Sequence, residues 1–178
     1  SFAGRVLCAG ESRRPGGSGA RDLRAGTKSC GGGAVTVACG PAWFGQASDT
    51  MLAVITAEAL GVLPEDVHVV SGDTSLAPVD LGSYSSRVTF MAGNATKDSA
   101  VKLRQQLTTV AAEHLVVPSE RIVLALRSVH HRDEPPKAIT FTDAAVLAAA
   151  RDGHLSSARS YKPPLAIGRA FLRTGPRA

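Results

Sequence analysis

Two short runs of small, hydrogen-bonding residues are the parts of this sequence best suited to chemistry. The run from Gly82 to Arg87 (GSYSSR) and the run from Gly45 to Ser48 (GQAS) each stand directly before an apolar segment. Where a helix begins, the first backbone N–H groups are unpaired and the macrodipole is positive. Small residues let an anion approach that backbone, and hydroxyl or amide groups add donors. Both runs therefore suit the binding of phosphate.

Ordinary helix capping explains the same residue types. Neither run is a P-loop or a G-x-G-x-x-G motif, and serine commonly satisfies helix ends. From residue types alone, capping is the favoured interpretation. Two entrances in one domain could also bind the separate phosphates of a dinucleotide, so a non-catalytic anion- or nucleotide-binding module stays open as an alternative.

The elements that must position both runs follow from apolar periodicity and from Gly and Pro punctuation. The expected strands cover residues 34–39, 66–70, 121–126, 137–141 and 154–161, and the expected helices cover residues 49–61, 86–114 and 143–153. Thr142 is the expected N-cap of the last helix. These elements predict an α+β fold in which a mixed sheet packs against about three helices. The 178 residues suffice for one domain.

Residues 1–33 differ from the rest in composition. They contain nine of the 18 glycines and six basic against two acidic side chains, so four of the five net positive charges lie there. We expect residues 1–33 to form a flexible Gly/Arg-rich segment and residues 34–178 to form the domain. A nucleic-acid binder that uses this basic arm is the least supported alternative, because the remainder lacks a basic face and an aromatic platform.

The other candidate features predict no site. The three cysteines form no C-x-x-C pair and are expected to be free thiols. His130 and His131 are expected in a solvated polar turn, with no metal bound. No run has the length of a signal peptide or a membrane span, so we expect a cytoplasmic protein without a membrane or nucleic-acid partner.

Two long segments resemble a known family. VTVACGPAWFGQASDTMLAVITAEALGV and DVHVVSGDTSLAPVDLGSYSSRVTFMAGNA resemble the molybdenum-binding large subunit of the xanthine dehydrogenase and aldehyde oxidase family. The most similar branch is the 4-hydroxybenzoyl-CoA reductase alpha subunit, and the tail SYKPPLAIGRAFLRTGP resembles the same family. The resemblance covers residues 34–178 and implies part of a molybdopterin-binding domain.

The resemblance implies a molybdopterin cofactor with molybdenum, in this branch the cytosine dinucleotide form. Gln46 would bond near the metal centre, Ser85 and Ser86 would line the pterin region, and the glycines would permit close approach. The implied cofactor-binding residues are Gly45, Gln46, Ala47, Ser85, Ser86, Thr89 and Gly93, with no protein ligand to the metal. Iron–sulfur and flavin subunits or domains would be partners, and the substrate would be a small aromatic, heterocyclic, aldehyde or acyl-CoA compound.

Two departures from the family pattern bear on function. Ala47 replaces the second glycine of the family's G-Q-G segment, which would cost about 1 kcal/mol if this position requires a positive φ. The family's catalytic glutamate, in a G-x-G-E segment, has no counterpart in this chain. We therefore expect a cofactor-binding fragment of a molybdenum-dependent oxidoreductase, incomplete for catalysis, with an inactive remnant as the alternative.

Overall fold

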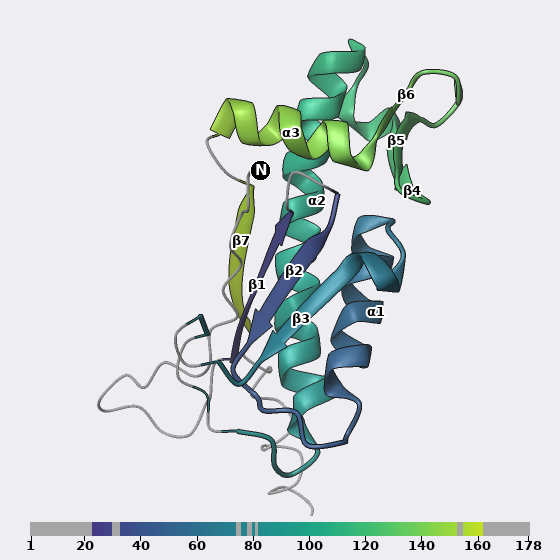
Figure 1. Ribbon diagram of the computed structural model, residues 1–178. Coiled ribbons are helices and arrows are strands. Elements are labelled where there is room, and N and C mark those ends of the chain that lie inside the picture. Colours follow the sequence, from purple (N-terminus) through teal and green to yellow (C-terminus); the bar gives the residue numbers. More distant parts are fainter. Residues whose placement is uncertain are drawn as a thin grey trace, which may run out of the picture.

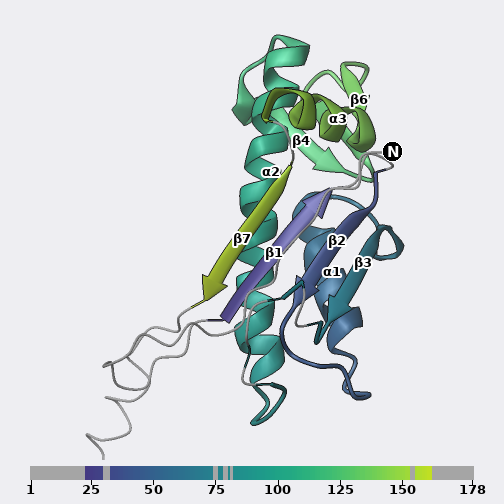
Figure 2. The same cartoon turned by 60° about the vertical axis from the view of Figure 1, so that its left-hand side comes forward.

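A four-stranded sheet forms one layer of the structure and two helices form the other. The computed structural model describes residues 23–29, 33–73, 76–77, 80, 82–152 and 155–161. The strand order is β3 (Val67–Ser71), β2 (Val35–Cys39), β1 (Leu23–Ser29) and β7 (Ser156–Tyr161). Figures 1 and 2 show α1 (Ser48–Leu60) and α2 (Gly93–Leu115) on the same face of this sheet. Together with α3 (Phe141–Asp152), these elements confirm the predicted α+β class.

A parallel strand–helix–strand unit forms one half of the sheet. β2 and β3 are parallel, with Val37 opposite Val69 and Cys39 opposite Ser71. A parallel pair needs a long crossover connection, and α1 supplies it. Sequence periodicity placed these three elements correctly to within one or two residues. Because the strands are parallel, both end at the same edge of the sheet.

β1 is a strand that the sequence analysis did not predict. It lies between β2 and β7 and pairs antiparallel with both. The expectation of a flexible segment over residues 1–33 is therefore wrong for Leu23–Ser29, and a domain boundary at residue 33 would divide the sheet. The sequence LRAGTKS has little apolar alternation, and its backbone pairs with a strand on each side. Residues 1–22 and 30–32 lie outside the described residues.

A smaller antiparallel sheet lies beside the far end of α2 (Figure 1). It contains β4 (Ile122–Ala125), β5 (Ser128–His131) and β6 (Ala138–Thr140) in that order. The prediction of a solvated turn at His130 and His131 is wrong, because both residues belong to β5. Alternation along β5 buries Val129 and His131, and the His131 Nδ1 atom accepts hydrogen bonds from the backbone N–H groups of Asp133 and Glu134.

The N-terminus of α3 is capped two residues earlier than predicted. Thr140 Oγ1 accepts a hydrogen bond from the N–H of Asp143 at 3.0 Å and donates one to the Asp143 carboxylate at 2.7 Å. Thr142, the predicted N-cap, lies inside the first turn of α3. Thr140 and Thr142 are both suitable caps by type. The helix begins at Phe141, whose side chain is buried in the core.

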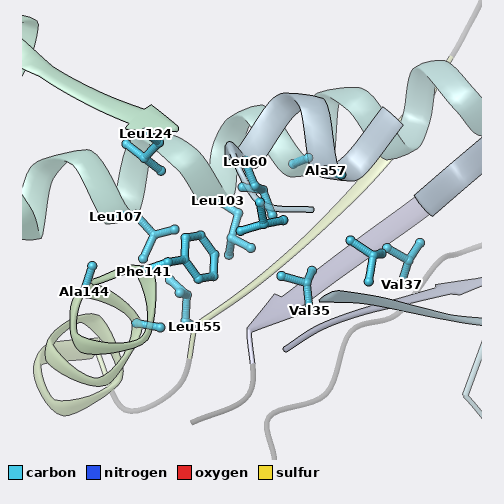
Figure 3. Close-up of a cluster of buried hydrophobic side chains, with 14 of the residues drawn as sticks. Val35, Val37, Ala57, Leu60, Leu103, Leu107, Leu124, Phe141, Ala144 and Leu155 are labelled. Carbon is cyan, nitrogen blue, oxygen red and sulfur yellow. The ribbon is translucent and has the colours of Figure 1, made fainter. Parts of the chain in front are cut away.

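The core is made of aliphatic side chains from both layers. Figure 3 shows Val35 and Val37 of the sheet beside Leu60, Leu103 and Leu107 of the helices, and all five are fully buried. Phe141, Ala144 and Leu155 extend the same cluster toward α3. One core therefore continues from the main sheet to the end of α2.

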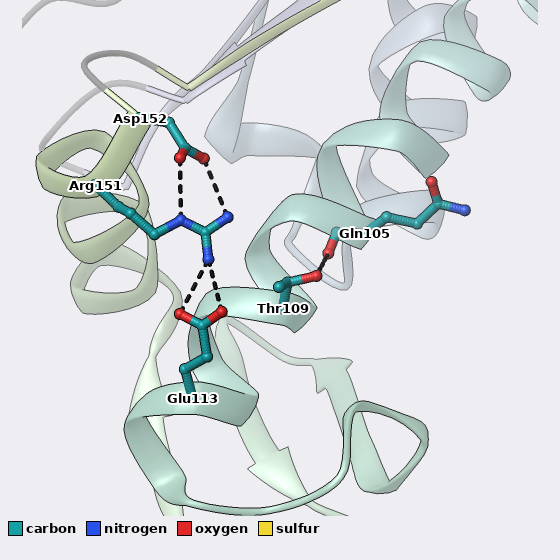
Figure 4. A network of polar contacts seen from close by, with 5 residues as sticks. All are labelled: Gln105, Thr109, Glu113, Arg151 and Asp152. Atoms are coloured by element: carbon teal, nitrogen blue, oxygen red, sulfur yellow. Dashed lines mark hydrogen bonds and ion pairs between the residues drawn. The ribbon is translucent and has the colours of Figure 1, made fainter.

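A polar contact joins α3 to α2 outside this core. Arg151 donates to both carboxylate oxygens of Glu113, at 2.9 and 3.0 Å, and to its neighbour Asp152 at 3.0 Å (Figure 4). The side chains are exposed, so water screens the ion pair and it contributes little stability. It orients α3 across α2 rather than supplying the energy that holds the two together.

A π-helical turn, Val88–Ala92, precedes α2 and continues into it. The predicted helix over residues 86–114 is confirmed with this correction at its start. On α2, Ala95 and Leu103 are fully buried, whereas Val101 is 39% exposed. Among the helices of the described residues, none is long and apolar enough to cross a membrane.

Candidate anion-binding site at two helix entrances

The two runs of small residues lie at the same edge of the main sheet. The loop of residues 40–47 connects β2 to α1, and residues 82–92 lead into α2. Figure 1 shows the first turns of both helices at the lower end of the view, where β2 and β3 end. The loops after the strands also touch, because the N–H of Gly72 donates to the Cys39 carbonyl at 2.9 Å. The carboxyl edge of parallel strands is the usual ligand side of such sheets.

Hydrogen bonds connect the two runs directly. Ser83 Oγ donates to the carbonyl oxygen of Ala42 at 2.7 Å. Gln46 Nε2 donates to the same carbonyl at 3.0 Å and contacts Ser83 Oγ at 3.4 Å. The Gln46 side-chain oxygen accepts from the N–H of Phe44 at 2.7 Å. The structure therefore brings together residues that lie 37 to 41 positions apart in the sequence.

The entrance to α1 is open at its N-terminal turn. Ala47 is the N-cap residue, with φ 56° and ψ 24°, and among the described residues no side chain caps this turn. The condition that made alanine unfavourable at this position, a positive φ, is met. Gly45, with φ 99°, lies just before it, and a Cβ there would meet no atom within 4 Å. The N-cap side chain therefore does not satisfy the first backbone N–H groups of α1.

The entrance to α2 contains two adjacent residues in the left-handed region. Ser85 and Ser86 both have φ 51°, which costs energy in a non-glycine residue and is typical of functional sites. Both serines are exposed, as is Thr89 in the following turn. Within the described part of the chain, no side chain caps the π turn that follows Arg87.

Arg87 has two guanidinium nitrogens without hydrogen-bond partners at this entrance, within the part of the chain that the structure describes. Its Nη1 and Nη2 atoms are buried and have no hydrogen-bond partner among the described residues. Its guanidinium carbon lies 4.8 Å from the centroid of the Tyr84 ring. Buried guanidinium nitrogens without hydrogen-bond partners are costly, because they have lost their hydrogen bonds to water. An anionic group bound there would satisfy both nitrogens.

Asp80 carries a second unsatisfied atom on the same segment. Its Oδ1 atom accepts from the N–H of Gly82 at 2.7 Å, while its Oδ2 atom is buried without a partner among the described residues. Burial raises the pKa of Asp80, and the Gly82 hydrogen bond and the Arg87 charge act in the opposite direction. Asp80 and Arg87 form no ion pair within 4 Å among the described residues, so their opposite charges interact only at longer range.

Six of the seven predicted site residues lie at the entrances. Those six are Gly45, Gln46, Ala47, Ser85, Ser86 and Thr89. Gly93 instead lies buried between α1 and α2, where a Cβ would come within 3.1 Å of Ile55 Cδ1 and 3.6 Å of Met51 Sδ. Its position therefore explains close helix packing without any ligand.

Ser83 and Arg87 were not among the predicted site residues, although they belong to the run GSYSSR at the entrance to α2. Residue type was the available signal, because arginine and serine are common in anion sites. Which of the four hydroxyls in GSYSSR faces the other loop depends on the backbone turns at Ser85 and Ser86. In the described residues, no cluster of three or more His, Cys, Asp or Glu side chains could hold a metal ion.

Comparison with known proteins assigns the family. The molybdopterin cofactor-binding domain family matches residues 24–174, which include β1 and both entrances. This chain belongs to that family, and it is a molybdenum cofactor-binding domain of the xanthine dehydrogenase and carbon monoxide dehydrogenase group of large subunits. The match begins in β1, so the expectation that the resemblance starts at residue 34 was ten residues short.

Individual relatives agree with this assignment. The chain is 32% identical over 140 residues to the 6-hydroxypseudooxynicotine dehydrogenase complex subunit gamma of Paenarthrobacter nicotinovorans, covering 79% of this chain and 17% of that protein. It is 30% identical over 148 residues to the putative xanthine dehydrogenase molybdenum-binding subunit XdhA of Escherichia coli K12, covering 79% and 20%. The crystal structure of the Cu,Mo-CO dehydrogenase superimposes with a TM-score of 0.72 at 28% identity, covering 92% of this chain and 21% of that one. The chain thus spans about a fifth of the length of these proteins.

Proposed function

We propose that this chain holds the anionic part of a molybdopterin cofactor between its two helix entrances. The observation that carries this proposal is the Arg87 guanidinium, whose two terminal nitrogens are buried without a hydrogen-bond partner among the described residues. The residues around it fit an anion, because the N-terminal turn of α1 is uncapped and hydroxyls surround the entrance to α2.

Each residue at the site has a role in this proposal. Arg87 pairs with an anionic oxygen, and Ser85, Ser86 and Thr89 donate from hydroxyls that face solvent in the structure. Gly45 and Ala47 expose the first backbone N–H groups of α1, and Gln46 offers an amide donor beside them. When bound, the cofactor supplies the molybdenum redox chemistry, and these side chains bind and orient it.

The wider activity also belongs to the proposal. We infer an oxidoreductase of the hydroxylase or 4-hydroxybenzoyl-CoA reductase type, with the cytosine dinucleotide form of the cofactor and a cytoplasmic location. Iron–sulfur and flavin proteins would carry the electrons, and the substrate would be a small aromatic, heterocyclic, aldehyde or acyl-CoA compound. Because the chain spans about a fifth of its relatives, we propose that the catalytic base and substrate pocket lie outside these 178 residues.

Metal and pterin content tests this function. The gene product that contains this chain would be co-expressed with molybdenum cofactor maturation proteins, and molybdenum, oxidised pterin and acid-released nucleotide would be measured per mole of folded protein. We expect near-stoichiometric molybdenum and pterin with released cytidine monophosphate, and a loss of at least tenfold in R87A.

Arg121→Ala is the matched control for R87A. Arg121 forms an exposed ion pair with Asp133 in the smaller sheet, so the substitution removes the same side chain away from the entrances. We expect R121A to retain the wild-type cofactor content. Equal retention by R87A and R121A, in protein that is folded by circular dichroism, would contradict the assignment of Arg87.

A simpler anion- or nucleotide-binding module remains the second candidate. The unsatisfied guanidinium favours it as well, because a free nucleotide phosphate would pair with Arg87 in the same way. The same purification separates the two candidates. Wild-type protein that carries nucleotide without molybdenum or pterin, and loses it in R87A, would support the module and exclude the cofactor.

A further inference from the structure

We propose that Ser83 is a positioning residue that holds Gln46 and the loop of residues 42–46 against the entrance to α2 before any ligand binds. This inference rests on the proposed function of the two entrances, because it explains how their spacing is set. Ser83 itself makes no ligand contact in this proposal. It acts through the carboxamide of Gln46 and the carbonyl of Ala42.

The donors and acceptors around Ser83 can be assigned from the contacts that it makes. The single hydroxyl proton of Ser83 is donated to the Ala42 carbonyl at 2.7 Å, which leaves the Ser83 oxygen as an acceptor. Gln46 Nε2 lies 3.0 Å from the Ala42 carbonyl oxygen and 3.4 Å from Ser83 Oγ. Because these two acceptors are only 2.7 Å apart, they share one N–H of Gln46, and the second N–H is not used in this triangle.

The orientation of the Gln46 amide follows from the same contacts. Its oxygen accepts from the N–H of Phe44 at 2.7 Å, which a nitrogen in that place could not do. A flipped amide would also set its oxygen against the Ala42 carbonyl oxygen, so only one orientation satisfies all three contacts. Gln46 therefore presents its donor side, and not its acceptor side, to the gap between the entrances.

Apolar burial does not hold this loop. Residues 42–47 are all exposed, including Trp43 at 57% and Phe44 at 67%. A free glutamine side chain would lose about 1.5–2 kcal/mol of rotamer entropy on becoming ordered for a ligand. The contact with Ser83 offsets part of that cost in advance. It is also the longest of the three hydrogen bonds made by Gln46, so it is the contact that a ligand oxygen would replace at the lowest cost.

Chymotryptic cleavage of the loop tests the positioning role without depending on activity. Trp43 and Phe44 are exposed aromatic residues, so mass spectrometry can follow cleavage after them in the intact gene product. We expect S83A to be cleaved there about fivefold faster than wild type, the factor for the loss of about one neutral hydrogen bond. S83T keeps the hydroxyl and should restore the wild-type rate.

Ser119→Ala is the matched control. Ser119 is exposed, and its hydroxyl contacts only its neighbour Glu120 among the described residues. We expect S119A to be cleaved at the wild-type rate. Cofactor content should fall in S83A, recover in S83T and stay unchanged in S119A.

Two outcomes would overturn the proposal. One is equal cleavage after Trp43 and Phe44 in wild type and S83A, and the other is a threonine variant that is cleaved as fast as the alanine variant. Failure of the proposed function has a different signature. Wild-type protein without molybdenum or pterin would refute that function, while the cleavage rates would still report on the contact between Ser83 and Gln46.

Discussion

The guanidinium of Arg87 lies over the ring of Tyr84, with its carbon 4.8 Å from the ring centroid. Three positions separate the two residues, and Ser85 and Ser86 between them both adopt a positive φ of 51°. This backbone turn brings the ring under the cation. The Tyr84 ring thus orients the Arg87 side chain. The terminal nitrogens of Arg87 remain without a hydrogen-bond partner among the described residues.

Replacing the Tyr84 ring should weaken cofactor binding. A cation–π contact contributes about 0.5–2 kcal/mol, depending on how far water is excluded. We expect Tyr84→Leu to lower molybdenum and pterin retention by about three- to tenfold, and Tyr84→Phe, which keeps the ring, to lower it less. Retention in Tyr84→Leu equal to that of wild type would show that the ring does not place Arg87.

Ala47→Gly should stabilise the protein. Ala47 has φ 56°, and glycine adopts this conformation without the strain of a Cβ. We expect a gain of about 1 kcal/mol in the free energy of unfolding, measured by urea titration with an unchanged m-value. Ala150→Gly, on the exposed side of α3, should instead destabilise by about 0.5–1 kcal/mol. A destabilised Ala47→Gly variant would contradict the inference that the positive φ strains Ala47.

Substitutions at Gly93 should separate packing from cofactor binding. Gly93→Ala gains helix propensity, and its Cβ would contact the flexible ends of Ile55 and Met51, which can shift by a few tenths of an ångström. We expect little change in stability for Gly93→Ala and a loss of about 1–3 kcal/mol for Gly93→Leu, measured by urea titration.

Cofactor content per folded molecule provides the second measurement on these Gly93 variants. We expect Gly93→Ala to retain the wild-type amount, because Gly93 is buried and its added Cβ would meet the side chains of Ile55 and Met51. A strong loss of cofactor in a folded, stable Gly93→Ala variant would show that Gly93 contributes to cofactor binding.

The contact between Asp66 and Arg127 should make stability depend on pH. Arg127 donates to both Asp66 oxygens, at 2.7 and 2.8 Å, and this hydrogen bonding lowers the pKa of Asp66. A carboxyl with a lowered pKa in the folded state stabilises the protein above its unfolded pKa of about 3.9. That contribution is lost as the pH falls through the lower folded value.

Asp66→Asn tests this dependence. We expect the variant to be less stable than wild type at pH 7, and the difference to shrink below about pH 4. The free energy of unfolding measured across this pH range provides the comparison. Asp133→Asn is the control, because Asp133 and its partner Arg121 are both about half exposed. A difference for Asp66→Asn that stays constant down to pH 2 would exclude the ionic contribution.

Local patterns in the sequence were sufficient for most of the fold. β2, α1, β3 and α2 have apolar residues at the spacing of their own elements, so each could be predicted without its neighbours. β1 could not, because LRAGTKS has no such spacing and its place in the sheet depends on pairing with β7 near the other end of the chain. At the start of α3, residue type left both Thr140 and Thr142 as caps, and the structure uses Thr140.

The sequence by itself determined which residue types surround the site, and six of the seven predicted residues lie there. The tertiary structure decided what each does. Ser83 meets Gln46 across 37 positions, the two terminal nitrogens of Arg87 are buried without a hydrogen-bond partner among the described residues, and Gly93 packs between helices. Residue type is local information, whereas a hydrogen bond, burial or a helix contact depends on which distant segments the fold brings together.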